Sequence, residues 1–253
     1  MSEKLSIRLG AKEFIAFGAP YMVAVGACYL IGYWGAFQIN VFEYISFSDV
    51  VKLAIYPLMA SLIFFLAGVV SSELLFSSHL PPGGGSKTGV SKLGFKHWRL
   101  VFAALILVIV LVVICAPEPG KWFLVATFLS LFSTPLSHVS EVIELLPNPR
   151  IRATVLFLSL LLPAMSFAYG RQEAYFVKTG SANYFVNVER SQLPLEFDEK
   201  SRVAYLGLLG DLYVLREGKT GNIVFLKQRS DTPLFLMPMQ SDNATAFHAP
   251  KLW

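Results

Sequence analysis

A glycine-rich segment at residues 79–99, HLPPGGGSKTGVSKLGFKHWR, contains the residue types that hold phosphate in nucleotide sites. A P-loop needs Gly, any four residues and then Gly-Lys-Ser/Thr after a strand, so that backbone amides and a helix N-terminus surround the phosphates. Here Lys87 follows Ser86 instead of a glycine, and an apolar segment precedes the loop. We interpret the segment as a connection between two helices and expect no nucleotide or other cofactor.

A row of polar side chains follows the fourth apolar segment at spacings of three and four residues. Its members are Thr127, Ser130, Thr134, Ser137, His138 and Glu141. On one helix these spacings give a polar membrane face, with His138 beside its lower end. In one interpretation the face lines a hydrophilic path, in which His138 and Glu141 handle protons or ions. In the other, the hydroxyls bond back to their own helix, Pro135 kinks it, and the two ionisable groups lie in interfacial water.

The sequence contains no complete metal-binding or catalytic motif. His138 and Glu141 are three residues apart, but no further ligand follows at the HExxH spacing. A GxSxG elbow is also missing, and the two cysteines, Cys28 and Cys115, lie in separate apolar segments and form no CxxC pair. We expect no metal site and no catalytic residues. Because motif searching finds only known solutions, an unfamiliar membrane enzyme is kept as the second alternative.

Long apolar segments must position these side chains. Hydrophobic residues make up 55% of the chain and charged residues 15%, and the apolar residues gather in blocks. A helix rises about 1.5 Å per residue, so about 20 mostly apolar residues cross a hydrocarbon core roughly 30 Å thick. Lipid offers the backbone no hydrogen-bond partner, so each crossing must be helical. We predict an integral membrane bundle over residues 1–170, with about five transmembrane helices at 14–37, 53–76, 100–116, 122–138 and 153–169.

Small residues recur every fourth position in the first of these helices. They are Ala24, Cys28, Gly32 and Ala36. Such a stripe lets another helix, of this chain or of a partner subunit, pack closely. Residues 25–28, VGAC, also resemble a lipoprotein cleavage box, but apolar residues continue past Cys28 to Trp34, so we favour the packing stripe.

Lysine and arginine in the short connections predict the orientation, because cytoplasmic loops carry the excess. The N-terminal segment and the second and fourth connections hold nine of them, whereas the first and third connections hold two. The basic loop that sets the topology contains Lys87, Lys92, Lys96 and Arg99. We therefore predict a multi-pass protein of a bacterial inner membrane with a cytoplasmic N-terminus. Five crossings place the C-terminal domain on the outer side, and four would place it on the inner side.

Residues 171–253 have a different pattern, of short runs rich in β-branched and aromatic residues separated by turn signals. The first run is EAYFVKT at 173–179, and residues 202–228 read as a three-stranded meander with Val214 in the core of its middle strand. The pattern predicts a small all-β extramembrane domain with antiparallel strands and a loose C-terminus. Its core is modest, so the domain is expected to lean on the helices or on a second copy.

The net charge of +4 arises mainly from the basic residues that set the topology, so we expect no nucleic acid among the partners. Our preferred hypothesis is a non-enzymatic membrane protein whose C-terminal β domain binds a partner or ligand. This would suit a sensor, an immunity or defence component, or an accessory subunit. The expected partners are the lipid bilayer and, through 171–253, a protein or a second copy. The first alternative is an oligomeric channel or transporter that uses the polar face of the fourth helix.

Overall fold

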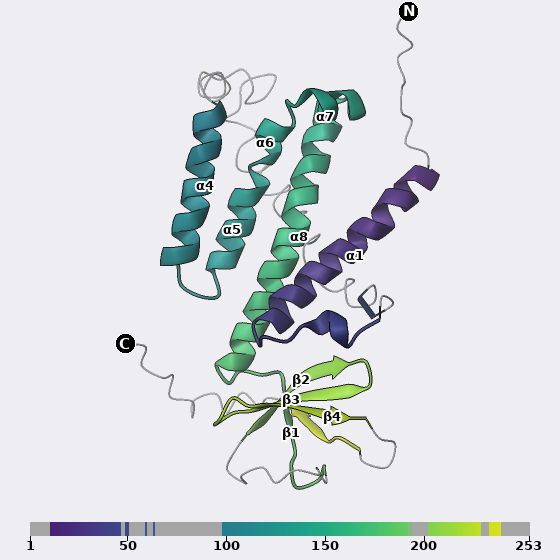
Figure 1. Cartoon of the computed structure of the whole chain (residues 1–253), viewed down its shortest axis with the longest axis vertical. Helices are drawn as coiled ribbons and strands as arrows, with labels where there is room; N and C mark the ends of the chain where they lie inside the picture. The colour runs from purple at the N-terminus through teal and green to yellow at the C-terminus, as the bar shows by residue number, and fades with distance from the viewer. Residues whose placement is uncertain are drawn as a thin grey trace, which may run out of the picture.

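A computed structural model of the chain describes residues 11–46, 49–50, 59, 63, 98–191, 193, 202–228 and 233–238. Helices form one part of the molecule, and a five-stranded sheet lies beneath the ends of α1 and α8 (Figure 1). Nearly all of the predicted helix at 53–76 lies outside the described residues, as do Lys87, Lys92 and Lys96. The helices are α1 (Ala11–Gly35), the 3-10 turn η1 (Val41–Glu43), α4 (Trp98–Cys115), α5 (Lys121–Ser130), α6 (Ser133–Leu136), α7 (Ser140–Leu145) and α8 (Pro149–Lys178).

Apolar helices pack side by side around α8. Helix α5 lies between α4 and α8, and α1 crosses α8 on another side (Figure 1). Within the described part of the chain, one helix, Arg152–Lys178, is long and apolar enough to cross a membrane, and Phe102–Cys115 and Lys121–Leu136 are shorter apolar helices. Large apolar side chains on α4 are open to the surroundings, with Leu100 68% and Ile114 73% exposed. The number of crossings stays a prediction.

Two glycines allow the backbones of α1 and α8 to meet. A Cβ on Gly32 would lie 2.4 Å from the carbonyl oxygen of Phe167, and one on Gly170 would lie 2.4 Å from the carbonyl oxygen of Tyr29. No side chain fits at such distances, so the crossing depends on glycine at both positions. Of the predicted stripe, Gly32 lies in this contact and Cys28 and Ala36 are half-buried, whereas Ala24 is exposed.

The predicted fourth helix at 122–138 corresponds to the apolar helical segment Lys121–Leu136, in which a short turn at residues 131–132 separates α5 from α6. Helix α5 ends at Ser130 and is followed by the short helices α6 and α7. Pro135 has no amide hydrogen, so it cannot donate to the carbonyl oxygen of Leu131. That oxygen accepts from Thr134 at 3.1 Å instead, in a tighter turn. The helical path is therefore tightened at this turn, and extended backbone first occurs at Val139, just after the predicted span.

Helix α8 continues to Lys178, so the strand expected at 173–179 is wrong. Ala174 and Val177, three residues apart, are buried on one face of the helix, and this packing outweighs the β propensity of the run. Gly180, with a φ of 86°, ends the helix. Its amide donates to Val177, and that of Ser181 donates to Phe176, as in a Schellman motif. The predicted domain boundary at residue 170 thus falls inside a continuous helix.

The sheet is antiparallel throughout, with strand order β4-β3-β2-β1-β5. Its strands are β1 (Tyr184–Val186), β2 (Val203–Leu209), β3 (Leu212–Glu217), β4 (Ile223–Lys227) and β5 (Leu236–Pro238). Strands β2, β3 and β4 form the meander that the turn signals at 202–228 predict, and Val214 in its middle strand is fully buried. A bulge between Tyr205 and Gly207 interrupts the β2–β3 pairing.

Candidate functional site at the junction of helices and sheet

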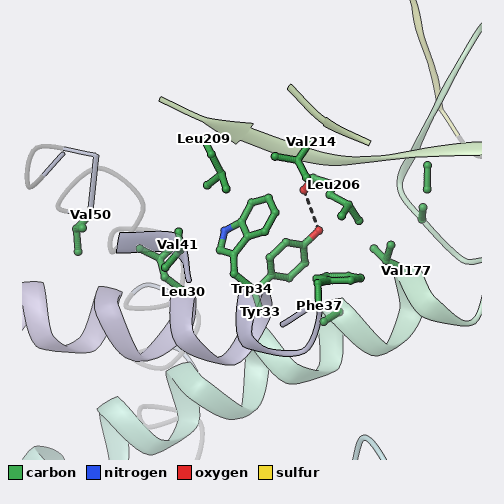
Figure 2. Close-up of a cluster of buried hydrophobic side chains, with 13 residues drawn as sticks. Leu30, Tyr33, Trp34, Phe37, Val41, Val50, Val177, Leu206, Leu209 and Val214 are labelled. Carbon is green, nitrogen blue, oxygen red and sulfur yellow. Dashed lines mark hydrogen bonds between the residues drawn. The ribbon is translucent and has the colours of Figure 1, made fainter. Parts of the chain in front are cut away.

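The sheet and the helices share one hydrophobic core at their junction. Figure 2 shows side chains from the end of α1 pointing toward the sheet, with Val177 of α8 beside them. The contributing residues include Leu30, Tyr33 and Trp34 of α1, Phe37 in the turn after it, Val41 of η1, Ala174 and Val177 of α8, and Ala204, Leu206, Leu209 and Val214 of the sheet. Because these side chains leave water only when helices and sheet are in contact, burial holds the two parts together.

The bulge in β2 makes the most specific contact in this core. Leu206 has no partner residue on β3, because Tyr205 pairs with Leu215 and Gly207 with Val214. Its carbonyl oxygen accepts a hydrogen bond of 2.8 Å from the Tyr33 hydroxyl instead (Figure 2). A bulge commonly redirects a group in this way. The irregularity in the sheet therefore provides the acceptor for a helix side chain.

Glycines bring the backbone of the sheet close to α1 and to the segment that follows it. Gly207 has a φ of 149°, and a Cβ there would lie 3.3 Å from the Trp34 ring. Gly210, with a φ of 59°, lies against Tyr44, whose carbonyl oxygen would be 2.6 Å from a Cβ. The Tyr44 ring also stacks on Phe225 of β4, with 5.4 Å between ring centroids. The segment after α1 thus packs, through Tyr44, against Gly210 and against Phe225 of β4.

A polar cluster links the α4–α5 connection to α8. Glu118 accepts hydrogen bonds from the Trp122 ring nitrogen at 2.9 Å and from Arg171 at 3.4 Å. It also forms an ion pair with Lys121 at 2.9 Å. Burial raises the pKa of Glu118, but the hydrogen bonds from Lys121 and Trp122 and the charges of Lys121 and Arg171 outweigh it, so the pKa lies below its usual value. Glu118 therefore stays ionised and binds the side chains of Lys121, Trp122 and Arg171.

The predicted polar face does not form one row. Ser130 and Ser137, seven residues apart, are buried, whereas Thr127, Thr134 and His138 are exposed. Glu141, also exposed, lies beyond the extended residue Val139 and so leaves the row. The hydroxyls of Thr127, Ser130 and Ser137 donate to the carbonyl oxygens of Phe123, Thr127 and Thr134 at 2.7–2.9 Å. These contacts are the local bonds that the second interpretation of this face predicts.

The ionisable members of this face lie near the surface. The His138 ring nitrogen Nδ1 lies 2.9 Å from the Thr134 carbonyl oxygen and 3.0 Å from the Ser137 hydroxyl. A backbone hydrogen bond, helped by the Ser140 hydroxyl, lowers the pKa of Glu141. Within the described residues, no three His, Cys, Asp or Glu side chains gather around a point that could hold a metal ion.

Among the side chains of the junction core, the sequence pattern predicts only Val214 as a buried residue. Gly207 and Gly210 within YLGLLGDLYVL were a usable signal, because glycine inside a strand pattern marks a bulge or a close approach of another backbone. The partner of that approach, Trp34, is far away in the sequence and carries no local sign. No known protein family, no curated protein and no solved structure matches the chain.

Proposed function

We propose that this chain is a non-enzymatic, multi-pass membrane protein whose C-terminal sheet binds a protein partner or ligand beside the bilayer. Helices α1 and α8 anchor the sheet and respond to that binding. The observation that carries the proposal is the core shared by the sheet and the two helix ends, with the buried Tyr33–Leu206 hydrogen bond inside it. A mere anchor needs no such contact, because a flexible linker would be enough.

The junction favours transmission of force between the sheet and the helices. Helix α8 runs into the junction without a break, and the short segment 179–183 joins it to β1. Strand β2 touches α1 through both Leu206 and Gly207. Since packed interiors resist gradual deformation, a partner that tilts the sheet would displace the ends of α1 and α8 as well.

Site-specific photo-crosslinking in cell membranes tests the proposal. A photoreactive residue at Met237, which is exposed on edge strand β5, should give an adduct with a protein. The control is Ile114, which is also apolar and is 73% exposed on α4, where only lipid adducts are expected. Release of the chain from membranes by alkaline carbonate would contradict the membrane assignment. Absence of protein adducts at Met237, Tyr184 and Leu208, all exposed on the sheet, would contradict partner binding by a protein.

A further inference from the structure

Three cationic side chains lie along the end of α8 and on the strand β3 that adjoins it. Arg171 and Lys178 are seven residues apart on α8, so they lie on one face, about 10 Å apart along the axis. Arg216 follows Val214 by two positions on β3, and side chains two apart in a strand share a face. Val214 packs in the core shared with the helices, so Arg216 also lies on the sheet face toward α8.

The strand pairing brings Arg216 near the end of α8. Its partner on β2 is Ala204, which belongs to the same buried cluster as Val177, the residue next to Lys178. The positive charges of Arg171 and Arg216 both act on the Lys178 ammonium group. Burial lowers the pKa of Arg216, because its guanidinium is half-buried beside the junction. Both arginines therefore repel the Lys178 ammonium group in a partly dehydrated place.

Acidic side chains do not balance this charge in the described part of the chain. Glu118 is the carboxylate that acts on Lys178, and it is already shared by Lys121 and Arg171. Glu173 is bonded to Tyr169 on another face of α8. Glu217 is bonded to Thr220 and lies on the opposite sheet face from Arg216. Neither Lys178 nor Arg216 has a carboxylate within ion-pair distance among the described residues.

In the proposed membrane location, the aromatic rings next to Arg171 and Lys178 would lie at the level of the lipid headgroups. Trp122 begins the apolar helix α5, and the Arg171 guanidinium lies 5.2 Å from its ring centroid. Tryptophan and arginine typically occupy the boundary between hydrocarbon and headgroups. Lys178, whose ammonium lies 5.6 Å from the Phe37 ring, is two turns further along α8 toward the sheet. The cations then face the layer that contains phosphate groups.

We propose that Arg171, Lys178 and Arg216 bind the phosphate group of an anionic phospholipid beside the junction of helices and sheet. The site rests on the proposed membrane location and does not depend on partner binding by the sheet. Phosphate oxygens accept charge-assisted hydrogen bonds from guanidinium and ammonium groups, and they would relieve the repulsion of Lys178 by the two arginines. A headgroup held here would touch both α8 and β3, and so would stabilise the junction.

Native mass spectrometry of the full chain in detergent micelles tests the site. Phosphatidylglycerol and phosphatidylcholine are titrated separately, and the affinity of the chain for the first lipid molecule bound is measured for each. The wild type should retain one phosphatidylglycerol more tightly than phosphatidylcholine. The double variant Lys178→Gln/Arg216→Gln should lose about tenfold or more in that affinity, since each basic residue contributes roughly 1 kcal/mol toward anionic lipid.

A charge-matched control separates a site from general attraction. The variant Arg190→Gln/Lys227→Gln removes two exposed cations, one in the turn after β1 and one at the end of β4, and should bind phosphatidylglycerol like the wild type. The conservative variant Lys178→Arg/Arg216→Lys should also retain the lipid, and unfolding curves report whether each variant is folded. Equal loss in both charge-removal variants, or equal retention of the two lipids by the wild type, would overturn the proposal.

Inorganic phosphate distinguishes the lipid from a free anion. Phosphate at millimolar concentration should leave phosphatidylglycerol binding unchanged at constant ionic strength. Full displacement by phosphate would overturn the lipid assignment in favour of a soluble phosphate site. The lipid measurement uses no protein partner and the crosslinking at Met237 uses no added lipid, so the two proposals fail separately.

Discussion

The Tyr33 hydroxyl donates a hydrogen bond of 2.8 Å to the carbonyl oxygen of Leu206, and both groups are buried. The donor lies near the end of α1, and the acceptor is the unpaired residue of a bulge in β2, 173 positions later. One polar bond thus connects a predicted membrane helix to the sheet. Its burial explains why the sheet cannot be treated as a separate appendage.

Replacing Tyr33 by phenylalanine should destabilise this junction. The Tyr33→Phe variant keeps the ring but leaves the Leu206 carbonyl oxygen buried without a donor, which costs about 1–3 kcal/mol in the free energy of unfolding. Denaturant unfolding in detergent, followed by tryptophan fluorescence, measures the change. Tyr184→Phe is the control, because the Tyr184 side chain is exposed. An equal effect of both substitutions would contradict a specific role for the Tyr33 hydroxyl.

The crossing of α1 and α8 should be intolerant of any side chain at Gly170. In Gly170→Ala the new Cβ would lie 2.4 Å from the Tyr29 carbonyl oxygen and 2.8 Å from the Tyr33 amide nitrogen, so the helices must separate. Overpacking of this kind costs about 1–3 kcal/mol. Thermal unfolding should show a lower midpoint for Gly170→Ala than for the control Gly120→Ala, where a Cβ meets nothing within 4 Å. Equal midpoints would mean that the helices are not in backbone contact.

The Glu118 cluster should make stability depend on pH. The pKa of Glu118 is lowered in the folded chain, so its ionised form stabilises the fold above the unfolded value of about 4.3. That stabilisation is lost as the pH falls through the lower, folded value. Unfolding midpoints of the wild type and Glu118→Gln should therefore differ at pH 7 and converge near pH 3. A difference that is as large at pH 3 as at pH 7 would contradict this role of the carboxylate.

Local sequence patterns predict several of the helices and strands. The core shared by the helices and the sheet, in contrast, depends on contacts between segments that are far apart in the sequence. The uniform apolar run at 100–116 agrees with α4, and the turn signals around 202–228 agree with the meander. The run at 173–179 was misjudged because Ala174 and Val177 are buried by α1 and the sheet, which a local β propensity does not reflect. The pairing of Trp34 with Gly207 likewise depends on tertiary structure alone.

The polar residues at the end of α5 and in the segments after it should prove dispensable for any passage of ions. The Ser130 hydroxyl already donates to the Thr127 carbonyl oxygen, and Thr134, His138 and Glu141 are exposed on elements that follow the break after α5. Alanine at all four positions (Ser130, Thr134, His138 and Glu141) should therefore leave proton and potassium flux through proteoliposomes unchanged. It should also change the free energy of unfolding by no more than about 1–2 kcal/mol, because only the Ser130 hydroxyl among them is buried.

Protein-free liposomes set the baseline for the flux measurement. Wild-type flux above that baseline that the fourfold variant abolishes would contradict the proposed function and support a channel or transporter.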